Sequence, residues 1–140
     1  MKILLSVDGS THSDRAVRHV IALLQGCSAH SVHLLNVQEP IDAPEIRSHM
    51  RASEIEAMQE TRGGDALASA RALLDTAGIG YAPAVLIGPI AASIARHAAE
   101  QGCEQIVMGT RGLGTLGSML MGSVATELLA LTDLPVTLVK

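Results

Sequence analysis

The sequence contains no tryptophan and no phenylalanine, and Tyr81 is its single tyrosine. Proteins that hold single-stranded nucleic acids stack the bases on several aromatic rings, and so does the common RNA-binding sheet. A cage for a quaternary ammonium ligand also needs several rings. One tyrosine therefore excludes these classes of site, and the core has to be built from aliphatic side chains.

Positive charge is also scarce. The 140 residues include 10 Lys and Arg against 14 Asp and Glu, which gives a formal net charge of −4. Binding to nucleic-acid phosphates uses a basic stripe, whereas the arginines of this chain are scattered along it. We therefore expect no nucleic-acid partner.

Long apolar runs and disulfide frameworks are missing as well. No stretch reaches the roughly 18 consecutive apolar residues of a membrane span, so we expect no membrane partner. The apolar start of the chain meets Asp8 too early for a signal peptide, and no small-residue cleavage site follows. The only two cysteines, Cys27 and Cys103, fit reduced thiols. These observations predict a single cytoplasmic domain over residues 1–140.

Strand and helix patterns alternate along the chain. Apolar runs typical of strands lie at 3–7, 32–37, 81–87, 105–108 and 134–139, with helical spacing between them. Glycines are expected to end three of the helices: the first at Gly26, the next at Gly78 and Gly80, and the third at Gly102.

The segment from Glu39 to Gly64 is polar and irregular, and we expect it to be partly helical from about Glu45. Gly63 and Gly64 are expected to interrupt that helix, with a cleaner helix from Asp65 to Ala77.

Residue types also predict where the other helices start. Thr11 and Asp14 have the spacing of a capping box. Pro89 suits the first position of the following helix, and Ser123 suits the cap of the last one.

The alternation predicts an α/β fold, namely an open five-stranded parallel sheet with helices on both faces. Ligands of such sheets bind beyond the carboxyl ends of the strands, near the point where strand order reverses. The segments that matter for function are therefore those that follow Val7, Val37, Ile87 and Met108.

A glycine-rich stretch, residues 109–122, leaves a predicted strand and enters the last predicted helix. Glycine allows the backbone to approach a ligand closely, and a helix N-terminus offers unpaired N–H groups to an anion. Ser123 could add a hydroxyl donor. This combination suits the phosphates of a nucleotide.

Two common nucleotide motifs fit this stretch poorly. Residues 112–117 formally match GxGxxG, but the helix starts later and no acidic residue ends the next strand, as a dinucleotide site requires. A Walker loop requires a lysine, and this region has none.

A third spacing is more specific. Gly109, Gly112, Gly122 and Ser123 form the pattern G-x2-G-x9-G-[S/T], and with it the sequence resembles the universal stress protein family. The opening strand and turn of that family are similar to residues 3–10, its fourth strand and loop to residues 106–112, and its closing strand to residues 134–139.

The resemblance implies a five-stranded Rossmann-like fold that commonly forms homodimers, and the glycine pattern is that of its ATP-binding branch. By position, Asp8 and the main chain of Val37 would lie at the adenine, with Met108 and Gly109 near the ribose. The phosphates would be surrounded by Arg111, Gly112, Gly122, Ser123 and Val124. The implied ligand is ATP, which can carry Mg²⁺ with it. Ala125 departs from the family, which often has a hydroxyl there.

Alternatives remain at several of these positions. Asp8 also fits a turn or cap residue, and Arg111 could be solvated. The six histidines form no metal motif, and no catalytic constellation is recognisable.

The sequence thus favours an ATP-binding, stress-related regulatory protein that switches conformation with its ligand, and it leaves enzymatic activity open. The alternatives are a slow ATPase and an interaction protein of the same fold without nucleotide. The last strand presents Val136, Leu138 and Val139, and a homodimer through that strand would cover it.

Overall fold

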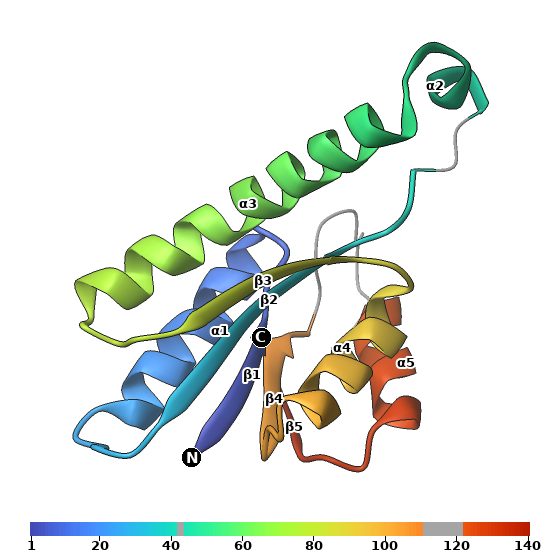
Figure 1. The fold of residues 1–140 in the computed structure, drawn as a ribbon. Helices are drawn as coiled ribbons and strands as arrows, with labels where there is room; N and C mark the ends of the chain where they lie inside the picture. Colours follow the sequence, from blue (N-terminus) through green and yellow to red (C-terminus); the bar gives the residue numbers. More distant parts are fainter. Residues whose placement is uncertain (42–43, 111–121) are drawn as a thin grey trace.

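The computed structural model describes residues 1–41, 44–110 and 122–140 of the chain. Five strands form one sheet in the order β3-β2-β1-β4-β5, and every neighbouring pair is parallel (Figure 1). Their bounds are β1 Lys2–Ser6, β2 Ser31–Gln38, β3 Ala82–Ile87, β4 Gln105–Gly109 and β5 Val136–Val139. The predicted open parallel sheet is confirmed.

Helices cover both faces of this sheet. They are α1 Thr11–Leu24, α2 Pro44–His49, α3 Ala52–Thr76, α4 Ile90–Glu100 and α5 Ser123–Leu131. Helices α1 and α3 pack on one face and α4 and α5 on the other, whereas α2 lies away from the sheet beyond the start of α3 (Figure 1).

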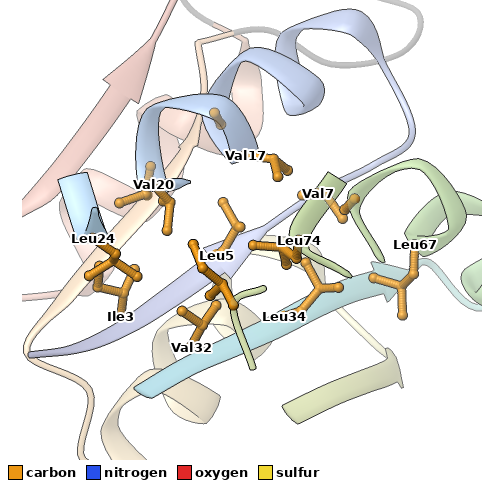
Figure 2. Packing of buried hydrophobic residues seen from close by; sticks show 14 residues of the cluster. Ile3, Leu5, Val7, Val17, Val20, Leu24, Val32, Leu34, Leu67 and Leu74 are labelled. Carbon is orange, nitrogen blue, oxygen red and sulfur yellow. The ribbon is translucent and has the colours of Figure 1, made fainter. Parts of the chain in front are cut away.

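Two aliphatic cores result from this arrangement. Under α1 and α3, Leu5 and Leu34 of the sheet meet Val17 and Leu74, all of which are buried (Figure 2). Alternate strand residues point to the opposite face, where Leu4 packs with residues of α4 and α5. Strands buried on both faces explain the continuous apolar runs in the sequence.

The chain reverses the direction of strand order at β1. Strands β2 and β3 are added on one side of β1, and β4 and β5 on the other. Ligands of such sheets bind at this switch point, beyond the carboxyl ends of β1 and β4. The segments after Ser6 and Gly109 therefore lie at the edge where a ligand is expected.

The predicted interruption at Gly63 and Gly64 is wrong, because α3 runs without a break through both glycines. Gly63 is buried, and a Cβ built on it would lie 2.3 Å from Cγ1 of Val85 in β3. A Cβ on Gly64 would meet no atom within 4 Å. Gly63 thus allows α3 to lie close against the sheet, which outweighs the low helix propensity of glycine.

Three helix starts differ by one residue from the prediction. Ser10, and not Thr11, caps α1, because its hydroxyl accepts from the N–H of Ser13. Pro89 is the N-cap of α4 and Gly122 that of α5, so Ser123 is the first helical residue. The predicted helix ends are confirmed: the backbone has positive φ at Gly26, Gly78 and Gly102.

The two outer strands of the sheet, β3 and β5, differ in that only β3 carries a proline at an outward-facing position. The backbone groups of successive strand residues point alternately to the two sides of the strand. The N–H of Gly88 bonds to Gln38 on β2, so the backbone of residues 83, 85 and 87 faces away from β2, toward the open edge. Residue 83 is a proline and has no N–H to offer, which blunts this edge. On β5, the carbonyls of Pro135 and Val139 bond to β4, so Val136 and Leu138 face outward with their N–H groups intact.

Candidate functional site

A cavity of about 330 Å³ lies beyond the carboxyl ends of β1, β2 and β4. Seven of the predicted site residues line it, namely Asp8, Val37, Met108, Gly109, Gly122, Ser123 and Val124. The other two, Arg111 and Gly112, lie outside the described residues. The structure therefore brings together residues from four separate segments at the place where strand order reverses.

Asp8 organises the turn between β1 and α1. Its Oδ1 accepts from the N–H of Ser10 at 2.9 Å and from the hydroxyl of Ser13 at 2.8 Å. Its own N–H donates to the Ser13 hydroxyl at 2.9 Å. Asp8 is thus the turn residue that one of the two interpretations expected, and this network holds its carboxylate at the cavity wall.

The main chain of Val37 faces the space that β1 leaves open. The last backbone bond between these strands runs from Val7 N–H to Leu35 O, at 2.9 Å. Alternate residues face the same neighbour, so Val37 also faces the β1 side. No described residue bonds to its N–H or C=O there. Val37 thus presents one donor and one acceptor side by side at the cavity, the arrangement that the edge of a nucleobase pairs with.

Two polar residues that the sequence analysis missed extend this wall. Asn36 is 2% exposed, and its Nδ2 donates to Val7 O at 2.8 Å. Gln38 Nε2 donates to Asn36 Oδ1 at 2.7 Å. Both residues line the cavity. The available signal was their alternate spacing at the end of the strand, directly after the apolar pair Leu34 and Leu35.

Met108 and Gly109 form the end of β4 at the opposite wall. A Cβ on Gly109 would lie 2.9 Å from Cβ and 3.0 Å from the backbone carbon of His12 in α1. A glycine is therefore required here for helix packing, whatever ligand the cavity takes.

The N-terminus of α5 opens onto the same cavity. Gly122, Ser123, Val124 and Ala125 all line it, and no side chain of the described residues caps the helix. The N–H of Gly122 is bonded to Thr110 O, which ties the helix start to the end of β4. The first N–H groups of a helix have no intrahelical partner and carry positive potential. This end of the cavity therefore favours an anionic group.

Ala125 is 1% exposed and forms part of the cavity floor. Ala125 has no hydroxyl, so the donors that this end of the cavity offers are the main-chain N–H groups and the hydroxyl of Ser123. In the part of the chain that the structure describes, no group of three or more His, Cys, Asp or Glu residues could hold a metal ion.

None of the described helices is both long enough and apolar enough to cross a membrane.

Comparison with known proteins gives consistent matches over the full chain. The model of the universal stress protein family matches residues 1–140. A universal stress protein of Thermus aquaticus is 34% identical over 139 residues, which covers 99% of this chain and 97% of that protein.

Solved structures share the architecture. The protein MJ0577 superposes with a TM-score of 0.84 at 26% identity, covering 99% of this chain and 94% of that one. A family protein of Arabidopsis thaliana, solved with AMP bound, has a TM-score of 0.71 at 19% identity and covers 100% and 91% of the two chains.

Proposed function

The chain belongs to the universal stress protein family, and we propose that it binds adenine nucleotides, with ATP as its ligand, in the cavity at the switch point of the sheet. The observation that carries this proposal is the pairing of two features in one cavity. The main chain of Val37 lies at the β2 end of the cavity and the N-terminus of α5 at the β4 end, and among the described residues neither has a hydrogen-bond partner for these groups.

The two ends suit the two halves of a nucleotide. A purine edge offers a donor and an acceptor side by side, which match the free C=O and N–H of Val37. The phosphates would lie at Gly122, Ser123 and Val124, where helix N–H groups and a hydroxyl can donate to them. Asp8, Met108 and Gly109 lie between these ends, and the predicted contacts of Arg111 and Gly112 with the phosphates remain part of the proposal.

Other findings support an adenine nucleotide in particular. The related Arabidopsis protein was solved with AMP bound. The residues present also fit the base without aromatic stacking, because Ile90, Ile94 and Met108 supply aliphatic walls. Mg²⁺ would be held mainly by the phosphates and by water, as is usual for this ion. We propose that the bound state serves regulation, and a cytoplasmic location remains a prediction.

Thermal unfolding with and without ATP and Mg²⁺ tests the proposal. A ligand that binds only the folded state raises the melting temperature as its concentration exceeds the dissociation constant. We expect such a rise with ATP and a smaller one with an equal concentration of inorganic triphosphate, which lacks the base. A melting temperature that stays the same at saturating ATP would contradict the proposal.

We further propose that the chain forms a homodimer through the edge of β5. Val136 and Leu138 turn free N–H groups outward there, whereas the β3 edge is blunted by Pro83. Leu129 and Leu131 of α5, the helix that precedes β5 in the chain, are 46% and 49% exposed and are further apolar surface that a partner could cover.

Proline substitution separates the two edges. Val136→Pro removes one outward N–H and leaves the bonds of Pro135 and Val139 to β4, so we expect it to convert a dimer into a monomer in sedimentation velocity. Ile87→Pro removes an outward N–H from the β3 edge and serves as the matched control, which should stay dimeric. A Val136→Pro protein that sediments as the wild type would show that this strand does not pair.

A further inference from the structure

We propose that Gln38 selects the base of the bound nucleotide, because its side-chain oxygen accepts a hydrogen bond from the exocyclic amine of adenine. This inference rests on the nucleotide binding proposed above. It adds a specificity-determining side chain to a site that otherwise contacts the base through the main chain.

A chain of hydrogen bonds fixes which way the Gln38 amide points. It begins at the carbonyl of Val7, which can only accept. Asn36 must therefore turn its Nδ2 toward Val7, at 2.8 Å, and its Oδ1 toward Gln38. Oδ1 can also only accept, so Gln38 presents Nε2 to it, at 2.7 Å. The oxygen of Gln38 is left pointing away from Asn36.

Burial makes this orientation hard to reverse. Asn36 is 2% exposed, so turning its amide over would set its Oδ1 against the oxygen of Val7 where the amide itself is almost entirely buried. A buried carbonyl that loses its donor is left without the hydrogen bonds that water would have given it, which is unfavourable. The fold, and not the ligand, thus determines which way the nitrogen and the oxygen of the Gln38 amide point.

Gln38 lines the cavity next to Val37, whose main chain is unpaired. Among the described residues, none donates a hydrogen bond to its Oε1. Adenine carries an amine donor at its sixth position, whereas guanine and hypoxanthine carry an oxygen acceptor there. The Gln38 oxygen, as an acceptor in the cavity wall, therefore favours the amine of adenine and disfavours the oxygen of guanine or hypoxanthine.

The test compares ATP with inosine triphosphate, which has an oxygen in place of the amine. Dissociation constants of both nucleotides are measured with Mg²⁺ for the wild type and for Gln38→Met, which keeps the length of the side chain and removes the acceptor. Val37 also discriminates through its main chain, so we expect the preference for ATP to fall by about tenfold and not to vanish. Gln38→Ala repeats the measurement with a shorter side chain, and Gln101→Met, at an exposed residue outside the cavity, is the control.

Each outcome has one meaning. A preference that falls in both Gln38 variants and stays in Gln101→Met supports the inference. It is overturned if both Gln38 variants keep the wild-type preference, if both nucleotides weaken equally, or if the wild type binds the two alike. In those cases nucleotide binding itself still stands. Failure of the wild type to bind ATP would instead refute the proposed function.

Discussion

Gly63→Ala is expected to lower the free energy of unfolding by about 2 kcal/mol, while Gly64→Ala, one residue further along α3, raises it by about 0.5 to 1 kcal/mol. The new methyl group at Gly63 would lie 2.3 and 2.8 Å from the two γ carbons of Val85. Val85 is β-branched and belongs to a strand, so it has little freedom to move aside. The helix has to shift away from the sheet, which costs more than the gain in helix propensity.

At Gly64 the same methyl group meets nothing within 4 Å, so only the propensity gain remains. The two variants are therefore matched controls for each other. Urea unfolding followed by circular dichroism, at one protein concentration, measures both, since the chain has no tryptophan to report by fluorescence. Adding Val85→Ala to Gly63→Ala should recover part of the loss, because it removes the γ carbons. Changes of the same sign at both glycines would contradict the packing of α3 against β3.

Ser123→Asp is expected to weaken ATP binding by at least about tenfold without lowering the thermal stability of the free protein. Ser123 is exposed, is the first residue of α5 and lines the cavity. A carboxylate there is favourable for the helix dipole, which stabilises the fold by about 0.3 to 1 kcal/mol. The same charge competes with the phosphates for the helix N-terminus and repels them.

Two further variants separate charge from shape. Ser123→Ala removes only the hydroxyl and should weaken binding less than the aspartate does. Ala92→Asp places the same charge in the first turn of α4, at an exposed residue outside the cavity, and should leave the affinity within about twofold of the wild type. Dissociation constants and melting temperatures of all variants are compared. If Ser123→Asp binds ATP as tightly as the wild type, the phosphates do not lie at α5.

Much of the fold could be predicted because its signals are local. Apolar runs such as 3–7 and 105–108 predict strands, and positive-φ glycines mark helix ends. The parallel sheet follows from their alternation. The strand-end rule pointed to the segments after β1, β2 and β4, and the family resemblance pointed to Asp8, Val37 and Met108 there, which the structure places around one cavity.

What the sequence could not give depends on which elements pack together. Gly63 looks like a helix breaker until Val85 of β3 is found against it. The bond from Asn36 to Val7 joins residues 29 positions apart, so it follows only from the pairing of β1 with β2. The difference between Ser10 and Thr11 as cap is local, but both are good cap residues and propensity does not separate them.

Isothermal titration of the wild-type protein with ATP and Mg²⁺ tests the central claim most directly. The cavity combines unpaired main-chain groups at Val37 with the N-terminus of α5, and a nucleotide satisfies both. We predict a single saturable binding transition whose heat is strongly reduced in Ser123→Asp. Titrations at several temperatures that show no saturable heat, together with an unchanged melting temperature, would contradict the account.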